Sequence, residues 1–167
     1  MGGLPRLYDL ADCARRNQRF VLAVSDNLQR RRFAQMAKYF GLRPCEPLVS
    51  RFAVVARSAQ LAEGSVVAHF AVIGPSVQLM PHVLVMHNAV IGPDTVVDAN
   101  CVVCADASIA GGVNIGADCF IGPNAAVAPN VLIAPSSDHS AGTGCLRSVS
   151  EPSVMIGNPA RRVAPQR

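Results

Sequence analysis

The chain has 167 residues and a formal net charge of +4; 50% of its residues are hydrophobic, 5% aromatic and 16% charged. This apolar content excludes a chain that is disordered throughout. No run of 18 apolar residues is present, so we expect no membrane span, and the arginines lack interleaved stacking aromatics, so we expect no nucleic-acid partner. The start of the chain carries no apolar, cleavable leader, and we therefore expect a cytoplasmic protein with reduced thiols.

Residues 1–48 have the pattern of a short, truncated α/β segment. Helical spacing relates four residues near the start, Leu7, Leu10, Ala11 and Ala14. Residues 19–24 form a continuous apolar run, which predicts a buried parallel strand. A second helix is expected to begin after a cap at Ser25, Asp26 or Asn27 and to end at Gly41. The segment is too short for a complete doubly wound sheet.

From Ser50 the sequence follows a period of six. Fourteen consecutive hexapeptides, from SRFAVV to APNVLI, carry Val, Leu or Ile at the sixth position and a small or β-branched residue at the fourth. Neither a strand period of two nor a helix period of 3.6 produces this pattern, whereas a short strand followed by a corner does. The pattern resembles that of the left-handed parallel β-helix, an all-β fold in which three hexapeptides form one triangular coil.

The end of the chain and the segment before the repeat resemble one enzyme family. The closing stretch IGNPARRV, residues 156–163, is similar to the C-terminal signature of hexapeptide-repeat acyltransferases. The stretch VLAVSDNLQRRRFAQMAKYFG, residues 21–41, resembles part of the nucleotide-binding domain in the sialic acid O-acetyltransferase and UDP-amino-sugar N-acetyltransferase family. This resemblance implies that residues 1–48 are a remnant of a nucleotide-sugar-binding domain and that residues 49–167 are the acyltransferase domain.

The resemblance also implies a function and an assembly. The family transfers acetyl from acetyl-CoA to an amino or hydroxyl group of a sugar or nucleotide-sugar, as a homotrimer with active sites between neighbouring β-helices. A trimer also agrees with the apolar residues that the repeat places at its outward fifth positions, because these would otherwise face water: Val66, Val72, Leu84 and Val90.

The catalytic base is the point at which this sequence departs from the family. Counting back from the C-terminal signature without gaps puts Pro93 where the family has a histidine and Val102 where it has a second one. His87 has the right position within its hexapeptide, but it lies one hexapeptide earlier. We predict His87 as the base, because an imidazole can accept the proton of an attacking amine or hydroxyl. Asp94 is the predicted residue that orients it, with Asp106 as the alternative.

Residues near the end of the chain are the predicted acetyl-CoA contacts. Backbone amides near Gly122 and Gly142 are expected to meet the pantetheine arm, and Arg161 or Arg162 the phosphates. No metal ion is expected.

Two other functions remain open from the sequence. Pro93 and Val102 favour a catalytically inactive trimeric family member that acts as a scaffold or binding module. A zinc enzyme similar to γ-class carbonic anhydrase would use His69, His82 and His87, although each is shifted by one position from that class's pattern.

Two further motifs are interpreted as structural. The stretch Ser136 to His139 has the residue types of a hydrolase triad, but neighbours in sequence rarely converge as nucleophile and base, so it predicts a ragged last coil. Cys101 and Cys104 form a C-x-x-C pair without a second pair, and Cys101 and Cys119 fall on inward positions, which predicts core residues.

Overall fold

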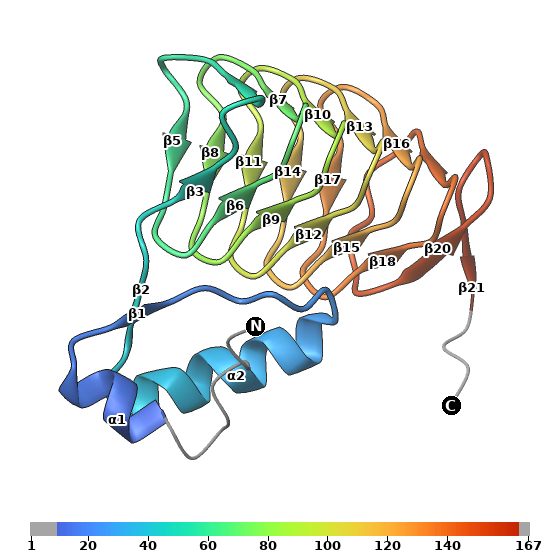
Figure 1. The fold of residues 1–167 in the computed structure, drawn as a ribbon. Helices are drawn as coiled ribbons and strands as arrows, with labels where there is room; N and C mark the ends of the chain where they lie inside the picture. Colours follow the sequence, from blue (N-terminus) through green and yellow to red (C-terminus); the bar gives the residue numbers. More distant parts are fainter. Residues whose placement is uncertain (1–9, 164–167) are drawn as a thin grey trace.

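Two helices and a pair of short strands precede the repeat in the computed structural model, which describes residues 10–163 (Figure 1). They are listed in chain order as α1 (Leu10–Arg15), β1 (Arg19–Phe20), α2 (Asn27–Tyr39) and β2 (Arg43–Pro44). β1 pairs in parallel with β2 alone, so the predicted strand over 19–24 is shorter than expected. Leu7, which we placed in the first helix, lies outside the described residues.

The predicted ends of the second helix are confirmed. Asp26 is the N-cap of α2, with extended backbone angles (φ −74°, ψ 117°), and its carboxylate accepts a hydrogen bond of 2.7 Å from the Gln29 amide. Gly41, just beyond the helix, has φ +77°, a left-handed conformation that glycine adopts without steric cost. Neither helix of the described chain has the length and apolar character needed to cross a membrane.

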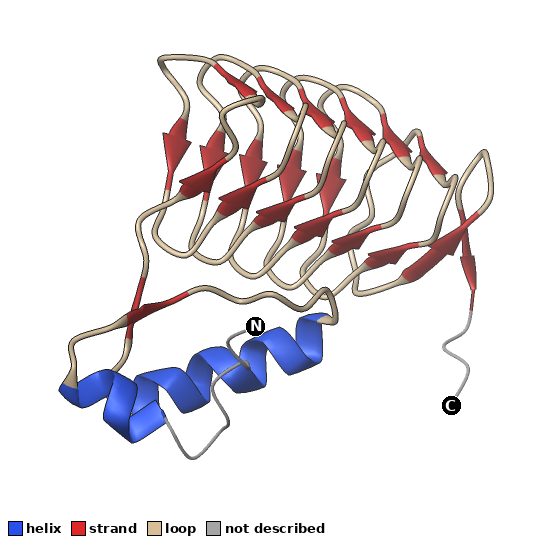
Figure 2. Cartoon of the chain, viewed as in Figure 1, coloured by secondary structure: helices blue, strands red, loops and turns tan. Residues whose placement is uncertain are grey.

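The repeat folds as a left-handed parallel β-helix with three faces, as predicted (Figures 1 and 2). Its strands occupy the fifth and sixth positions of the hexapeptides, and residues 18 apart pair in register, as in Val72 with Val90. Face 1 consists of β3 (Leu48–Val49), β6 (Val66–Val67), β9 (Leu84–Val85), β12 (Val102–Val103), β15 (Phe120–Ile121), β18 (Asp138–His139), β20 (Val154–Ile156) and the antiparallel β21 (Arg161–Val163). Face 2 consists of β4 (Val54–Val55), β7 (Val72–Ile73), β10 (Val90–Ile91), β13 (Ser108–Ile109), β16 (Ala126–Val127) and β19 (Gly144–Cys145). Face 3 consists of β5 (Gln60–Leu61), β8 (Gln78–Leu79), β11 (Val96–Val97), β14 (Asn114–Ile115) and β17 (Leu132–Ile133).

The corners between the faces follow from the first four positions of each hexapeptide. From Gly64 onward the third position turns the chain with a positive φ, between 56° and 62° where it is not glycine, and most of the residues there are Asn, Asp, Ser or Gly. These residue types tolerate the left-handed conformation best. We name the corners by the faces they join: residues 86–89 belong to corner 1–2, residues 92–95 to corner 2–3 and residues 98–101 to corner 3–1.

Inward-facing side chains form one continuous core along the β-helix. The sixth and fourth positions supply it, and from the second coil onward they are almost fully buried, including Val67, Ile73, Ile91 and Ile115. Cys101 and Cys119 are fully buried at fourth positions, and their Sγ atoms lie 3.0 Å and 3.2 Å from backbone carbonyls, which confirms them as core residues.

The N-terminal segment is fastened to the β-helix by Arg30, whose side chain is fully buried. Its guanidinium donates hydrogen bonds to the carbonyls of Leu22 and Val24 (3.3 and 2.7 Å), to the Asn100 side chain (3.3 Å) and to the His82 carbonyl. Two of these acceptors belong to the N-terminal segment and two to corner 3–1. Arg30 therefore bridges the N-terminal segment and the β-helix.

Candidate functional site

The predicted catalytic pair does not come together within one chain. His87 lies at corner 1–2 and Asp94 at corner 2–3, so the width of face 2 separates them. Both residues are exposed. Asp94 occupies the turn position of its corner, with φ +56°, and its amide donates 2.9 Å to the Pro75 carbonyl.

The alternative orienting residue, Asp106, is directed elsewhere. It lies one coil above His87 at corner 1–2, and its carboxylate accepts a hydrogen bond of 3.1 Å from the Asn88 side chain. Its amide donates to the backbone carbonyl of His87 at 3.2 Å. Within one chain, this carboxylate is therefore committed to Asn88 rather than to the His87 imidazole.

The three histidines of the zinc alternative lie at two different corners. His69 and His87 are stacked at corner 1–2, whereas His82 is at corner 3–1 beneath the N-terminal segment, stacked on Phe20 with ring centroids 5.6 Å apart. Burial, and secondarily the nearby Arg30 cation, lowers the pKa of His82. In residues 10–163 no three His, Cys, Asp or Glu side chains are grouped to hold a metal ion. Within one chain, the fold thus keeps His82 apart from the stacked His69 and His87.

The two positions where the family has histidines have different surroundings. Pro93 is exposed at corner 2–3, immediately before Asp94. Val102 is fully buried although its position faces outward from face 1, at the level where the N-terminal segment docks. Position 93 is therefore open to a ligand, whereas position 102 serves the packing of the N-terminal segment.

The glycines predicted to meet the pantetheine arm both lie at corner 1–2, but their amides are already engaged. The Gly122 amide donates 2.7 Å to the His139 carbonyl, and the Gly142 amide donates 2.8 Å to the Pro123 carbonyl. The coils therefore use the amides of these two glycines to stack, and the predicted contact with the pantetheine arm stays a prediction for the amides near them. A Cβ at residue 122 would lie 2.6 Å from the His139 carbonyl oxygen, whereas residue 142 has open space around it.

The two predicted phosphate-binding arginines also differ. Arg161 lines a cavity of about 460 Å³ at the C-terminal end of the β-helix, together with Arg147, Ser148 and Pro159. Arg162 forms an ion pair of 3.0 Å with Glu151. Sequence analysis missed Arg147, which lies after the last clear hexapeptide, where the repeat no longer indicates which residues share a corner.

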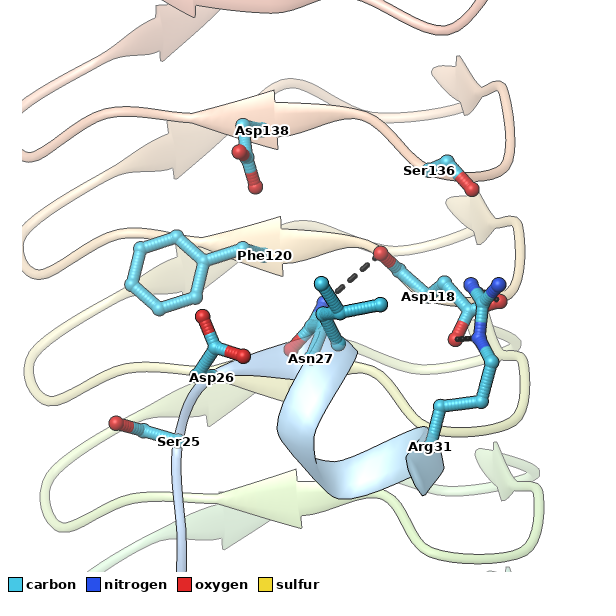
Figure 3. Close-up of a pocket in the computed structure, with 9 residues that line it drawn as sticks. Ser25, Asp26, Asn27, Arg31, Asp118, Phe120, Ser136 and Asp138 are labelled. Atoms are coloured by element: carbon cyan, nitrogen blue, oxygen red, sulfur yellow. Dashed lines mark hydrogen bonds and ion pairs between the residues drawn. The ribbon is translucent and has the colours of Figure 1, made fainter. Parts of the chain in front are cut away.

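A second cavity, of about 540 Å³, lies between the start of α2 and face 1 (Figure 3). Nine residues line it: Ser25, Asp26, Asn27, Leu28, Arg31, Asp118, Phe120, Ser136 and Asp138. Figure 3 shows the carboxylates of Asp26 and Asp138 on either side of the Phe120 ring. Burial, and secondarily the Asp26 carboxylate, raises the pKa of Asp138.

Asp118 lines this cavity and also binds side chains of the N-terminal segment. Arg31 contacts its two carboxylate oxygens at 2.5 and 3.2 Å, and the Asn100 side chain donates to it at 2.7 Å. The Asn27 side chain donates 2.8 Å to the Asp118 carbonyl. The charge of Arg31 is thereby neutralised by Asp118. The two remaining carboxylates, those of Asp26 and Asp138, make the cavity acidic. The stretch SDN at the start of α2, residues 25–27, was the sequence signal for this site, although the sequence analysis interpreted it only as a helix cap.

The triad-like stretch does not form the ragged coil that we predicted, because β18 pairs in register with both β15 and β20. Ser137 and His139 are fully buried at inward positions of the last complete coil. Neither ring nitrogen of His139 has a hydrogen-bond partner, and burial lowers its pKa to about 4. Because Ser137 and His139 are enclosed in the core of the β-helix, they cannot act on a substrate as nucleophile and base.

The comparisons with known proteins confirm the predicted resemblance. Residues 70–105 match the profile of the bacterial transferase hexapeptide family (six repeats). A search of curated protein sequences finds no match. Solved structures of acetyltransferases match the fold of almost the whole chain, the N-terminal segment included.

Two of these structures illustrate the similarity. A histidine-to-asparagine mutant of perosamine N-acetyltransferase from Caulobacter crescentus, in complex with CoA and GDP-perosamine, is 26% identical with a TM-score of 0.89, over 94% of this chain and 75% of that one. The acetyltransferase domain of PglB from Neisseria gonorrhoeae FA1090, in complex with acetyl coenzyme A, is 24% identical with a TM-score of 0.89, over 98% of this chain and 80% of that one. At 24% identity, the similarity to the PglB domain supports the fold alone.

Proposed function

We propose that this protein is an acetyl-CoA-dependent acetyltransferase that acts on an amino or hydroxyl group of a sugar or nucleotide-sugar. The observation that carries the proposal is the similarity to perosamine N-acetyltransferase. It spans the N-terminal segment and the β-helix together, at a TM-score of 0.89 over 94% of the chain. The two cavities agree with two substrates, since one is acidic and the other is lined by arginines.

The acidic cavity beside α2 is the proposed acceptor site. The carboxylates of Asp26 and Asp138 suit the hydroxyl and ammonium groups of an amino-sugar, because both kinds of group donate hydrogen bonds. Phe120 offers an apolar surface to a sugar or base ring. This assignment agrees with residues 1–48 as the remnant of a nucleotide-sugar-binding domain.

The arginine-lined cavity at the C-terminal end is the proposed site for the phosphates of acetyl-CoA. Arg147 and Arg161 line it together, and guanidinium groups bind phosphate through paired hydrogen bonds. Arg162 is a weaker candidate because Glu151 already pairs with it. The small residues of corner 1–2, which include Gly122 and Gly142, leave room for the pantetheine arm.

The proposed reaction is direct transfer. The acceptor nitrogen or oxygen attacks the thioester carbonyl, a C–N or C–O bond forms, and the C–S bond breaks. His87 accepts the acceptor's proton and returns it to the CoA thiolate. Because the two corners are apart within one chain, the Asp94 that orients His87 belongs to a neighbouring copy in the proposed trimer. We also propose a homotrimer in the cytoplasm, where the six cysteines, all free in the structure, would remain reduced.

A trimeric binding module without catalysis is the second candidate, and Pro93 is the observation that favours it. A mixture of the purified protein, acetyl-CoA and GDP- and UDP-linked amino-sugars discriminates between the two candidates. The enzyme releases free CoA thiol in proportion to acetylated sugar detected by mass spectrometry. A protein that binds acetyl-CoA or the nucleotide-sugar in calorimetry and yet releases no thiol would contradict the enzyme and support the binding module.

A further inference from the structure

A third cavity, of about 420 Å³, lies between the N-terminal segment and the first coils of the β-helix. Residues of α2, β1 and β2 line it from the N-terminal segment, and Glu63 and His82 of corner 3–1 line it from the β-helix. In the described part of the chain it shares no lining residue with the acceptor cavity or with the arginine-lined cavity at the C-terminal end. We propose that this third cavity is a separate site that binds a sugar phosphate and thereby holds the N-terminal segment on the β-helix.

Two cations of the third cavity are not paired with an acid. Lys38, in the last turn of α2, and Arg43, in β2, both line it, and neither forms an ion pair with another residue in the range 10–163. The register partner of Arg43 on β1 is Arg19, which pairs with Glu46 at 2.7 Å. Arg43 therefore lies beside a second arginine without a counter-charge of its own, and an anion in the cavity would supply one.

The imidazole of His82 has a defined place in the wall of the third cavity. Its ring stacks on Phe20 with an angle of 26° between the two planes. A Cβ at residue 64 would collide with this ring, so the glycine there leaves room for it. Nδ1 is enclosed without a hydrogen-bond partner among the described residues, whereas Nε2 is not an enclosed atom. A neutral imidazole protonated at Nε2 can therefore donate a hydrogen bond to a ligand in the cavity.

The rest of the lining suits a ring that carries hydroxyl groups. Phe20, Leu42 and Pro44 supply apolar surface, against which the C–H groups of a sugar ring can pack. Glu63 and Gln35, both exposed, offer oxygen atoms that accept hydrogen bonds from hydroxyl groups. The volume lies within the range of about 300–1,000 Å³ that is usual for small-molecule sites.

A sugar phosphate matches these groups better than a simple anion or a neutral sugar. A phosphomonoester carries nearly two negative charges at neutral pH, which Lys38 and Arg43 would balance. Glu63 repels a ligand that is anionic throughout, but it accepts the hydroxyl groups of a sugar. The cations line the cavity from the N-terminal segment and the carboxylate lines it from the β-helix. A ligand with a phosphate and a hydroxylated ring therefore contacts both parts of the chain.

Helix α2 connects the third cavity to the acceptor cavity. It runs along the β-helix, with its start near the later coils and its end near the first (Figure 1). Asn27 and Arg31 line the acceptor cavity, and Lys38, about two turns beyond Arg31, lines the third cavity. Between them, Arg30 donates a hydrogen bond to the carbonyl of His82. A ligand in the third cavity joins the same two parts that Arg30 joins. If the proposed function holds, the ligand also strengthens binding of the acceptor, because it favours the docked position of α2.

Calorimetry with glucose 6-phosphate tests the site. The wild type is expected to bind it more tightly than inorganic phosphate, which lacks the ring, and more tightly than glucose, which lacks the charge. Arg43→Gln and Lys38→Gln should each weaken this binding by roughly 10- to 100-fold, the usual effect of losing a hydrogen bond to a charged group. Both side chains are exposed, so both variants are expected to fold. The matched control is Arg32→Gln, an exposed arginine of α2 outside the cavity, which should bind as the wild type does.

The arginine-lined cavity at the C-terminal end is the other place where a phosphate could bind, and Arg147→Gln distinguishes the two. This variant is expected to bind glucose 6-phosphate as tightly as the wild type does. Binding that is lost in Arg147→Gln and kept in Arg43→Gln would overturn the proposal, because the ligand would then occupy the C-terminal cavity. Equal affinity for glucose 6-phosphate and inorganic phosphate would also overturn it, since the sugar ring would contribute nothing.

Hydrogen exchange measures whether the ligand holds the N-terminal segment. With glucose 6-phosphate at one hundred times its Kd, the amides of α2 that exchange when the segment undocks should exchange about 100-fold more slowly. Unchanged exchange of α2 in a protein that binds the ligand would overturn the bridging role.

Neither measurement needs catalysis, so the site and the proposed function can fail separately. Binding and protection in a protein without transferase activity would support the site and count against the proposed function. An active transferase that binds no glucose 6-phosphate would overturn the site and leave the function standing.

Discussion

At the scale of single residues, His87 is the proposed base, one hexapeptide before the position where the family has a histidine. It is exposed at corner 1–2, in a turn that other residues form equally well in other coils. Its side chain therefore contributes little to packing, and its loss can be interpreted as a loss of chemistry.

The first prediction concerns the removal of this imidazole. His87→Ala is expected to lower kcat by roughly 10²- to 10⁴-fold, the usual contribution of a general base, with the affinity for acetyl-CoA preserved. Steady-state kinetics and calorimetry on the same preparation measure both quantities. Transfer at the wild-type rate would eliminate His87 as the base.

His139 makes the stability of the last coil depend on pH. It is fully buried without a partner for either nitrogen, and its pKa falls to about 4. A histidine in the unfolded chain has a pKa near 6.5. Between about pH 6.5 and pH 4, the unfolded chain therefore binds a proton at residue 139 that the folded chain does not bind. Stability is therefore lost as the pH falls through this window.

The second prediction follows from this loss of stability at low pH. His139→Ile, which restores the residue type of the other inward positions, should be more stable than the wild type at pH 4.5 by up to about 3 kcal/mol, beyond any difference at pH 7.5. Denaturant unfolding at the two pH values measures this difference. If the substitution changed the free energy of unfolding by the same amount at both pH values, protonation of His139 would not contribute to the pH dependence. His82, whose pKa is also lowered, accounts for a residual slope in both proteins.

At the scale of elements, the N-terminal segment depends on one buried cation. Arg30 remains charged at neutral pH although burial lowers its pKa to about 10. Its hydrogen bonds hold two carbonyls of the segment and two groups of corner 3–1. Removing Arg30 therefore takes one donor from each of four acceptors, which are buried or partly buried.

The third prediction is that Arg30→Met detaches the segment without unfolding the β-helix. The opening free energy of residues 10–47 should fall by about 3 kcal/mol, and binding of the nucleotide-sugar should weaken because α2 lines the acceptor cavity. Hydrogen exchange separates the two parts of the chain, and the exposed Arg32→Met is the matched control. Unchanged protection of α2 would show that Arg30 does not hold it.

At the scale of the whole molecule, the proposed trimer would cover face 2, on which Val54 and Val90 are exposed in the single chain. The fourth prediction is that the wild type is a trimer and that Val54→Asp dissociates it, because three carboxylates would be buried near the axis. The variant Gln60→Asp, one hexapeptide later on face 3, should remain trimeric. Light scattering measures the masses, and a monomeric wild type at micromolar concentration would contradict the trimer.

The β-helix could be predicted from the sequence because its rule is local. A period of six fixes which residue faces inward at every coil, so the inward Val67 and Ile91, the corner positions and the core cysteines all follow from counting. The helix cap at Asp26 and the stop at Gly41 were equally predictable, since each depends on a few neighbouring residues.

The tertiary structure alone decided the rest, because those features join residues that no period relates. Arg30 meets Asn100 across 70 positions, and Asn27 meets Asp118 across 91, so the cavity between α2 and face 1, the proposed acceptor site, could not be located from the SDN stretch alone. Counting also could not show that the Gly122 amide is used by the next coil, or that His87 and Asp94 stand on opposite sides of one face. The sequence by itself determined how each coil is built; the packing of distant segments determined what the coils place side by side.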